Sequence, residues 1–429
     1  MKKLLTSAIV GLALFGLTAC SSGNDGSGDS AAKDSDKVTV WAWDETFNIA
    51  AMNEAKEVYG DKGKDVEIVT MSQDDIVQKL NTSLASGSTE GLPNIVLIED
   101  YRIQGYLTSY PDAFSDLSDI VKEDDFSAYK FAVNKVDDKI YGVPFDTGVT
   151  GLFYRTDLLE EAGYKESDLE DITWDDYIEM ARTVKEKTGK AMLSLNPSDL
   201  GLARVIMQSA GEWYTDDKGN VTIENNKSLA YGLEVFATLL KDGLADPVSD
   251  WDGGVNAVQS GSVASTPNGS WYSSTIQGAE DQKGNWKIAP TPTIAGNADS
   301  VHASNLGGSG WYVIKGVDGE AAAKEFLGAT FASDKELMGT LAEKIGVVST
   351  MKAAQETEQY KAGSDFYGGQ KVFEDFSKWS TEIPSVNYGM NTYAIESVMV
   401  EFAQRVIDGE DTATVLKEAQ KQVEAQVAN

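Results

Sequence analysis

The sequence has very few of the side chains on which most catalytic and metal centres depend. Among 429 residues there is one cysteine, Cys20, and one histidine, His302. A single cysteine cannot form an intrachain disulfide, and one cysteine with one histidine cannot supply a four-ligand zinc site. A Ser-His-Asp triad would have to use His302, but no G-x-S-x-G motif accompanies it. We therefore expect no metal and no cofactor, and we expect His302 to lie in a surface loop.

Basic residues are also scarce. The chain has 36 lysines and arginines against 68 acidic residues, which gives a net charge of −32. Such a surface repels nucleic acids and anionic ligands, because both are held mainly by lysine and arginine contacts. We expect no nucleic-acid partner, and the acidic field favours a neutral or a cationic ligand.

Long apolar runs are missing except at residues 4–17, directly after Lys2 and Lys3. A run of about 14 residues is shorter than the roughly 20 that a membrane-spanning helix needs. A basic start, a short apolar middle and small residues before Cys20 are the order of an export signal. The residues after Cys20 are mostly serine, glycine and aspartate, which cannot form a core. The pattern predicts a signal peptide over 1–19 and a flexible linker over 20–37.

The segment Leu17-Thr18-Ala19-Cys20 resembles the lipobox of bacterial lipoproteins. This resemblance implies that a lipid is attached to the Cys20 thiol and that cleavage occurs just before it. Loss of Lys2 and Lys3 with the leader would take the net charge from −32 to −34. The expected product is an extracytoplasmic lipoprotein anchored to the cell membrane through Cys20.

Beyond the linker the sequence alternates strand and helix patterns. Residues 38–43, 66–71 and 94–99 are rich in β-branched and apolar side chains, as strands covered on both faces are. Amphipathic stretches separate them, one of which begins with a capping sequence at Ser72. This order predicts an α/β fold with a mostly parallel sheet flanked by helices. About 390 residues follow the linker, enough for two domains.

Several residues at the ends of these elements have the chemistry to hold a neutral sugar. Ligands of parallel sheets bind beyond the carboxyl ends of the strands, where Trp43 and Asp44 lie. Asp146 also ends a strand pattern, and Trp271 follows the polar turn at 267–270. Aromatic rings cover the C–H face of a sugar, while carboxylate and amide groups bond its hydroxyls. These positions predict a carbohydrate site.

Other conspicuous residues have simpler interpretations. Trp41 lies within a strand pattern, and Trp174 and Trp379 lie within helical patterns, so we expect all three to be packed in the core. Residues 307–310 are rich in glycine but lack the Lys-Ser/Thr ending of a phosphate loop, which favours a tight turn or hinge. Residues 216–220 lack the spaced ligands of a calcium loop and predict a hairpin turn.

A set of short motifs occurs in one order over residues 38–429. They are Val38-Thr39-Val40-Trp41, Asn94-Ile95-Val96-Leu97, Tyr101-Arg102, Tyr141-Gly142-Val143-Pro144, Phe153-Tyr154-Arg155-Thr156-Asp157-Leu158-Leu159, Asn268-Gly269-Ser270-Trp271, Gly308-Ser309-Gly310-Trp311 and Ala321-Ala322-Ala323-Lys324-Glu325-Phe326-Leu327. Together with the lipobox, they resemble the extracellular solute-binding lipoproteins of bacterial ABC sugar importers. The resemblance is to family 1, the carbohydrate branch that includes maltose-binding protein.

This resemblance implies a two-lobed periplasmic-binding-protein-like fold. Each lobe would be a mostly parallel sheet flanked by helices, and a multi-crossover hinge would join the lobes. The implied N-terminal lobe is 38–146 plus 310–348, and the implied C-terminal lobe is 149–306 plus 351–429. The implied crossings lie near 146–149, 306–310 and 348–350.

The resemblance also implies a function. The expected protein is a monomeric, non-enzymatic receptor that captures a neutral carbohydrate, in particular an oligosaccharide, and delivers it to ABC permease subunits. The ligand-binding residues that the resemblance and the element ends select are Trp43, Asp44, Asn48, Tyr101, Arg102, Asp146, Trp213, Trp251, Asn268, Trp271, Gly308, Trp311, Asn387, Tyr388 and Tyr393. The loop 44–48 lacks the acid-plus-lysine pair of the maltose binder, which argues against maltodextrin specificity.

Other classes of protein remain compatible with the sequence. A secreted glycoside hydrolase needs two carboxylates about 5 to 10 Å apart. The 68 acidic residues cannot exclude such a pair, although no motif selects one. An adhesin or scaffold would show no change on binding a small molecule. A peptide or polyamine receptor of the same broad fold would also suit the acidic field.

Overall fold

A computed structural model describes residues 34–216 and 218–427, all of which belong to one compact unit. The predicted signal peptide, Cys20 and most of the predicted linker lie outside the described residues. Within the described ranges, no helix combines the length and the apolar character needed to cross a membrane.

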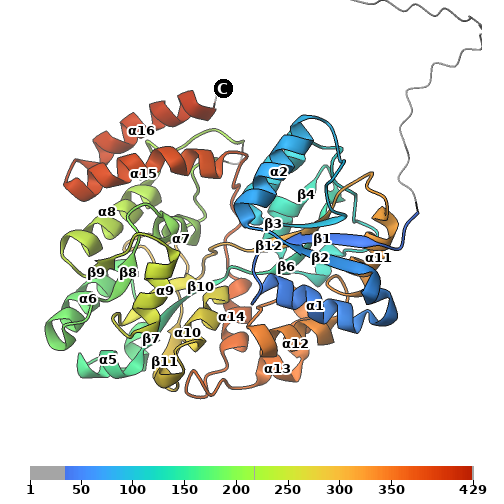
Figure 1. The fold of residues 1–429 in the computed structure, drawn as a ribbon. Coiled ribbons are helices and arrows are strands. Elements are labelled where there is room, and N and C mark those ends of the chain that lie inside the picture. Colours follow the sequence, from blue (N-terminus) through green and yellow to red (C-terminus); the bar gives the residue numbers. More distant parts are fainter. Residues whose placement is uncertain (1–33, 217, 428–429) are drawn as a thin grey trace, which may run out of the picture. The chain divides into compact units, whose positions relative to one another are not determined.

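The first sheet has five strands in the order β2-β1-β3-β12-β6 (Figure 1). β1 pairs in parallel with β2 and β3, whereas β12 runs antiparallel between β3 and β6. The strands are β1 (Val38–Ala42), β2 (Val66–Thr70), β3 (Ile95–Glu99), β6 (Gly142–Asp146) and β12 (Ser309–Val313). We call this sheet and the helices that cover it lobe 1.

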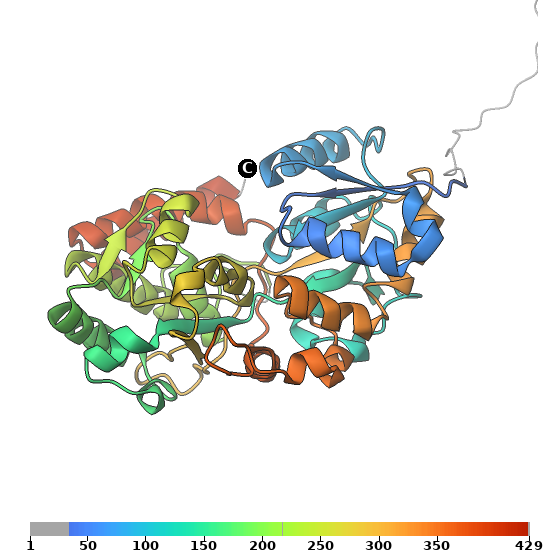
Figure 2. The same cartoon turned by 60° about the horizontal axis from the view of Figure 1, so that its bottom comes forward.

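Helices cover both faces of the lobe 1 sheet, and its inner strands are accordingly mostly apolar. Val40 and Leu97 belong to the core on the α1–α12 face, whereas Trp41 and Val96 belong to the core on the α2–α3 face. The expectation that Trp41 is a core residue is confirmed. Figure 2 shows α1 and α12 side by side. The helices are α1 (Asn48–Val58), α2 (Gln73–Ala85), α3 (Asp100–Ser109), α4 (Phe131–Asn134), α11 (Glu320–Ala329) and α12 (Lys335–Ile345).

The second sheet has the order β10-β7-β11, and we call it lobe 2 with its helices. β7 runs antiparallel to both neighbours, and among the described strands of lobe 2 the parallel pairing expected in each lobe joins β8 to β9. This antiparallel pairing follows from the chain path. The chain runs away from the hinge along β7 and runs back toward it along β10 and β11. The strands are β7 (Thr150–Arg155), β8 (Leu193–Leu195), β9 (Ala245–Pro247), β10 (Ser265–Gly269) and β11 (Trp286–Ala289).

Helices α6, α8 and α9 of lobe 2 each begin at a side-chain cap. The Thr173 side chain accepts a hydrogen bond from the Asp176 amide at the start of α6, as its sequence predicts. Trp174 and Trp379 are buried, which confirms their packing roles. α15 packs against α8 and α16 (Figure 1). The helices are α5 (Thr156–Glu161), α6 (Trp174–Thr188), α7 (Gly201–Ser209), α8 (Lys227–Lys241), α9 (Trp251–Gln259), α10 (Ser273–Gln277), α15 (Thr392–Asp408) and α16 (Thr412–Val427).

Smaller elements complete the described chain. β4 and β5 form a hairpin, and the turn at 215–221 closes with an antiparallel bridge between Thr215 and Val221, as the hairpin-turn interpretation predicts. These elements are β4 (Lys135–Val136), β5 (Lys139–Ile140), α13 (Glu358–Lys361) and α14 (Val372–Ser380).

Three chain segments cross between the lobes and lie side by side. The Thr147 amide donates to the Val348 carbonyl at 3.0 Å, and the Leu306 amide donates to the Gly148 carbonyl at 2.8 Å. The segment at 146–149 therefore lies between the other two. A Cβ added to Gly148 would stand 2.3 Å from the Leu306 carbonyl oxygen, so this approach requires glycine. The fold is a two-lobed one with a multi-crossover hinge.

Candidate functional site

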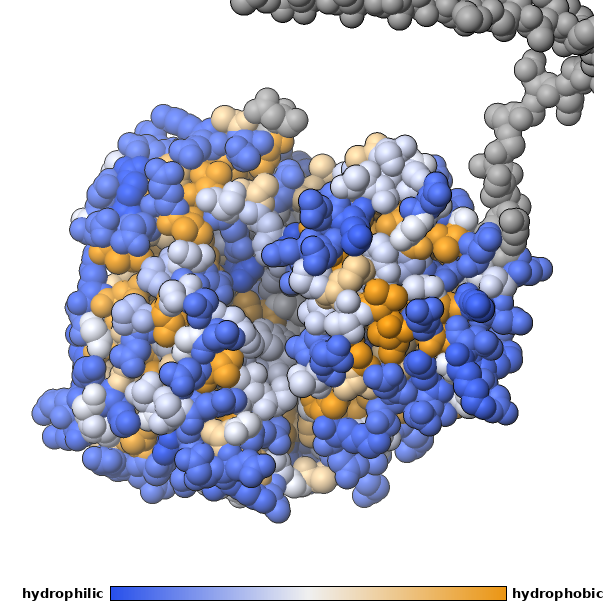
Figure 3. Space-filling model, viewed as in Figure 1, coloured by the Kyte–Doolittle hydropathy of each residue, from blue (hydrophilic) through white to orange (hydrophobic). Residues whose placement is uncertain are grey.

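A pocket of about 390 Å³ lies between the lobes, where the surface is visibly hollowed (Figure 3). It lies at the carboxyl end of β3, the edge at which a parallel sheet is expected to bind ligands. Lobe 1 contributes Glu99 and Tyr101, and a crossover contributes Leu306 and Gly307. The other lining residues come from lobe 2 and are Ser198, Asp199, Leu200, Arg204, Trp251, Asn268, Trp271, Tyr393, Glu396 and Val400.

Two tryptophans form one wall of this pocket. The rings of Trp251 and Trp271 lie 5.7 Å apart at 33°, and Tyr272 packs edge-on against both. The Trp271 Nε1 donates to the Leu306 carbonyl at 2.8 Å, which ties this ring to a crossover. Trp251 is 56% exposed. An apolar face held in water at the edge of a polar pocket is the surface on which a sugar ring stacks.

A buried charge cluster forms the floor. Arg204 of α7 donates to Glu396 at 3.1 Å and to Asp199 at 3.3 Å, and its guanidinium lies 5.2 Å from the centre of the Tyr101 ring. Burial alone would lower the pKa of Arg204, but Glu396 and Tyr101 outweigh it and raise that pKa. Among the described residues, the buried Arg204 Nε has no hydrogen-bond partner. This cluster presents a fixed donor and charge-paired acceptors to a ligand hydroxyl.

A second cluster joins lobe 1 to α15. Glu99 accepts from the Arg102 Nε at 2.9 Å and from the Tyr393 hydroxyl at 2.9 Å. The Arg102 guanidinium also lies 3.9 Å from the centre of the Tyr393 ring. The carboxylate that ends β3 is thereby held by partners on both sides of the pocket.

The structure brings part of the predicted site together. Five of the predicted residues line the pocket: Tyr101, Trp251, Asn268, Trp271 and Tyr393. Arg102 lines an adjoining pocket of about 250 Å³ that shares Tyr101 and Tyr393.

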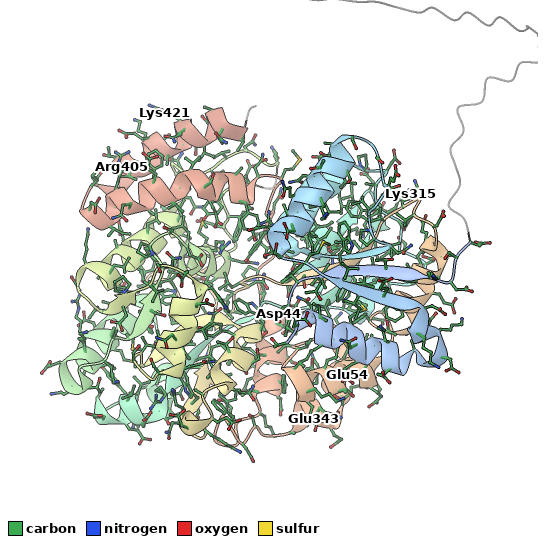
Figure 4. All side chains as sticks on the ribbon, viewed as in Figure 1. Asp44, Glu54, Lys315, Glu343, Arg405 and Lys421 are labelled. Carbon is green, nitrogen blue, oxygen red and sulfur yellow. The ribbon has the colours of Figure 1, made fainter. Side chains whose placement is uncertain are left out.

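Trp43, Asp44 and Asn48 do not line the pocket; they order their own loop. The Asn48 side chain accepts from the amides of Trp43 and Asp44, at 3.2 and 3.1 Å. Asp44 in turn accepts from the Thr46 and Phe47 amides at 2.8 and 3.0 Å. Figure 4 shows Asp44 at the end of β1, on the side of lobe 1 that faces lobe 2. Asn48 is buried, which corrects its expected role as a ligand contact.

Further predicted contacts are corrected by burial. Trp311 packs between Phe145 and Phe331, because β12 is an inner strand with helices on both faces. Trp213 stacks on Tyr101 and donates to Thr392 at 3.1 Å. The buried residues that present no side chain to the pocket are Asn48, Asp146, Trp213, Gly308, Trp311 and Tyr388. Asn387 lines a separate pocket beside Trp213.

Asp146 belongs to a hinge network that the sequence did not reveal. Its carboxylate accepts from the Ser309 amide and hydroxyl at 2.8 and 2.6 Å. The fully buried Lys130 donates to both Asp100 carboxylate oxygens at 2.7 Å, and to the carbonyls of Asp146 and Ser309 at 3.1 and 2.9 Å. Burial raises the pKa of Asp100 to about 6, and the Lys130 charge opposes that shift. Lys130 thus ties the end of β3 to two crossovers.

Sequence reasoning also missed Arg204 and Glu396. A signal for Arg204 exists, because it is the only charged residue in the otherwise apolar or small run 200–207. A buried helix rarely carries such a residue without a partner. Glu396 has no comparable signal, since an acidic residue on a half-exposed helix such as α15 is ordinary.

A larger pocket of about 710 Å³ lies between α10, α12, α13 and α14. It contains none of the predicted residues, neither tryptophan of the wall and no member of the Arg204 cluster. Across residues 34–216 and 218–427, no three potential metal ligands gather into a group. We therefore place the candidate site in the interlobe pocket.

Comparison with known proteins gives consistent matches. A family described as bacterial extracellular solute-binding protein matches residues 48–367. A lactose-binding protein of Rhizobium radiobacter is 38% identical over 430 residues, covering 100% of this chain and 98% of the relative. An arabinooligosaccharide-binding protein of Halalkalibacterium halodurans is 27% identical, covering 80% of this chain and 79% of its own. The solved GacH receptor of Streptomyces glaucescens shares the fold with a TM-score of 0.76 at 18% identity, covering 92% and 98% of the two chains.

Proposed function

Since the chain belongs to the bacterial extracellular solute-binding protein family, we propose that it captures a neutral oligosaccharide outside the cytoplasm and delivers it to an ABC importer. The disaccharide lactose is the first ligand to consider, because the relative named for lactose binding matches over the whole length of this chain.

One observation carries this proposal: the two-tryptophan wall faces the Arg204 cluster across a single pocket. Trp251 and Trp271 offer apolar faces, while Arg204, Asp199 and Glu396 offer hydrogen-bonding groups. Sugars present both kinds of surface at once. Arg204, Asp199 and Glu396 line the pocket as a charge-paired group, so a ligand hydroxyl can make charge-assisted hydrogen bonds with them.

The proposed mechanism is closure of the lobes on the ligand. Glu99 and Tyr101 come from lobe 1, whereas Trp271 comes from lobe 2. A sugar that contacts both sets stabilises the arrangement in which the lobes are close, and so shifts the equilibrium toward it. The hinge that permits this is the set of three crossovers, two of which Lys130 holds together.

The same proposal includes the bounds of the two lobes, the lipid anchor and the permease partner. We assign 38–146 with 310–348 to lobe 1 and 149–306 with 351–429 to lobe 2, supported by the membership of the two sheets. Lipid anchoring through Cys20 and docking to permease subunits rest on the lipobox and on the family. The protein acts as a monomer and catalyses no reaction on the sugar.

The proposal is tested by isothermal titration of the purified protein with lactose, arabinooligosaccharides, maltooligosaccharides, a peptide mixture and spermidine. We expect one class of saccharide to bind and to be recovered intact by chromatography. Recovery of cleaved sugar would make the protein a hydrolase. Binding of peptide or spermidine alone would refute the carbohydrate proposal.

A further inference from the structure

A second chamber of about 190 Å³ lies beside the main pocket, on the lobe 2 side. It is bounded by β8, by the end of β10 and by α9, which packs against β8 (Figure 1). The two chambers share four lining residues, namely Asp199, Trp251, Asn268 and Leu306. The side chamber has about half the volume of the main one. If the main pocket holds a disaccharide, the side chamber holds one more sugar unit.

The side chamber has the lining that a sugar requires. Tyr272 and Pro267 supply apolar surface, while Asn196, Asp250 and Thr266 supply polar groups. At the boundary, the Asn268 side chain uses its oxygen to accept from the Gly269 amide at 2.8 Å. Its amide nitrogen makes no hydrogen bond within the described chain and stays available to a ligand.

Trp251 stands at the boundary between the two chambers, and it is held differently from Trp271. The Trp271 Nε1 is fixed by its bond to Leu306, whereas the Trp251 Nε1 makes no hydrogen bond to any described residue. The Trp251 ring contacts the rings of Trp271 and Tyr272, and more than half of Trp251 is exposed. It is also the first residue of α9, two and three positions before Gly253 and Gly254, which weaken the start of a helix. This ring can therefore turn, while Trp271 cannot.

We propose that the side chamber is a subsite for one further sugar unit, and that Trp251 determines ligand length by closing the passage to it. This inference rests on the proposed carbohydrate function. In the present arrangement the main pocket accepts a disaccharide, and a longer chain enters the side chamber only when the Trp251 ring moves aside. Trp251 is thus a specificity-determining residue as well as a stacking one.

The test compares Kd values for disaccharides and trisaccharides by isothermal titration. The probes are lactose and maltose, and trisaccharides that extend each by one unit at either end. For each pair of sugars, the measured quantity is the ratio of the disaccharide Kd to the trisaccharide Kd. In Trp251→Ala we expect this ratio to be about tenfold higher than in wild type for at least one pair. Val58→Ala, which trims an exposed apolar residue on α1, is the matched control and should leave the ratio unchanged.

A second variant tests whether the gain in relative trisaccharide affinity depends on the side chamber. Gly254 lines the side chamber only, and a Cβ added there meets no atom within 4 Å. Gly254→Leu in the Trp251→Ala background should fill the chamber and abolish the gain. A ratio that Trp251→Ala leaves unchanged, or a gain that survives Gly254→Leu, would overturn the subsite. If the folded wild type binds none of these sugars, the carbohydrate function itself fails and the subsite with it.

Discussion

At the scale of single residues, three tryptophans show how neighbours decide the role of a side chain. Trp271 lies just after the end of β10 and stays partly exposed, and it lines the pocket as the element-end interpretation predicts. Trp311 follows a glycine-rich segment, but it lies within β12, which is covered on both faces. The turn expected at 267–270 is wrong, since residues 267–269 belong to β10, and the glycine-rich segment before Trp311 runs directly into β12. Sequence patterns could not reveal that β12 is an inner strand, because its neighbours β3 and β6 are distant in sequence.

Trp271→Ala should weaken sugar binding by about 1 to 3 kcal/mol, because it removes a stacking face in the pocket. The stability of the protein should change little, since the ring is not part of the core. Titration calorimetry measures the first quantity and urea denaturation the second. Trp311→Phe is the matched control, with reduced stability and unchanged affinity. The opposite pattern would show Trp271 to be a core residue.

Arg204→Met should make stability depend more steeply on pH. Burial raises the pKa of Glu396 above 4.5, and the Arg204 charge opposes this shift. A carboxyl group with a raised folded-state pKa stabilises the fold below its unfolded pKa, and this contribution is lost as pH rises through the folded value. Without Arg204 the folded pKa rises further. We therefore expect the free energy of unfolding to fall more than in wild type from about pH 4.5 to 7.

Urea denaturation at several pH values measures this slope. Adding Glu396→Gln to Arg204→Met removes the titrating group and should cancel the extra slope. Equal slopes for wild type and Arg204→Met would contradict the pairing of Arg204 with Glu396.

At the scale of elements, local patterns predicted the first three strands of lobe 1 and the helix that begins after Ser72. They did not predict the antiparallel sheet of lobe 2. The apolar runs of β7 and β10 specify burial, but strand direction follows from where the chain crosses the hinge. The hinge network escaped prediction for a related reason: the burial of Lys130 depends on β3, β6 and β12 meeting there, and these strands are distant in sequence.

Lys130→Met should lower the free energy of unfolding by about 3 to 5 kcal/mol, because Asp100 is then buried without its cation. The measurement is urea denaturation at about pH 8, above the pKa of Asp100. The double variant Lys130→Met/Asp100→Asn should recover most of the loss, since it removes the unpaired charge. A single variant as stable as wild type would argue against the pair as a hinge anchor.

At the scale of the whole molecule, the pocket joins residues that lie far apart in sequence. Glu99, Arg204, Trp271 and Glu396 come from four separate elements and meet only in the folded chain. Resemblance to a family could predict that such a site exists between two lobes. The Arg204 cluster depends on helix packing in this chain and became visible only in its structure.

Saturating sugar should stabilise the protein and make it more compact. At about 100 times its Kd, a ligand adds roughly 2.7 kcal/mol to the native state, which raises the melting temperature by a few degrees. Small-angle X-ray scattering should show a smaller radius of gyration with sugar than without it. The Trp271→Ala variant at the same sugar concentration should show a smaller rise in melting temperature. A melting shift with an unchanged radius would mean that binding occurs without closure.

The position of β12 has a consequence for the order in which the chain can fold. β12 is separated by more than 160 residues from β6, yet it occupies the place between β3 and β6. A growing polypeptide that has not yet reached residue 309 leaves facing edges of both strands unpaired, and such edges invite aggregation. Lobe 1 therefore cannot complete its sheet until three quarters of the chain has been made. Neither half of the molecule can be cut out as an independent folding unit at a single point in the sequence.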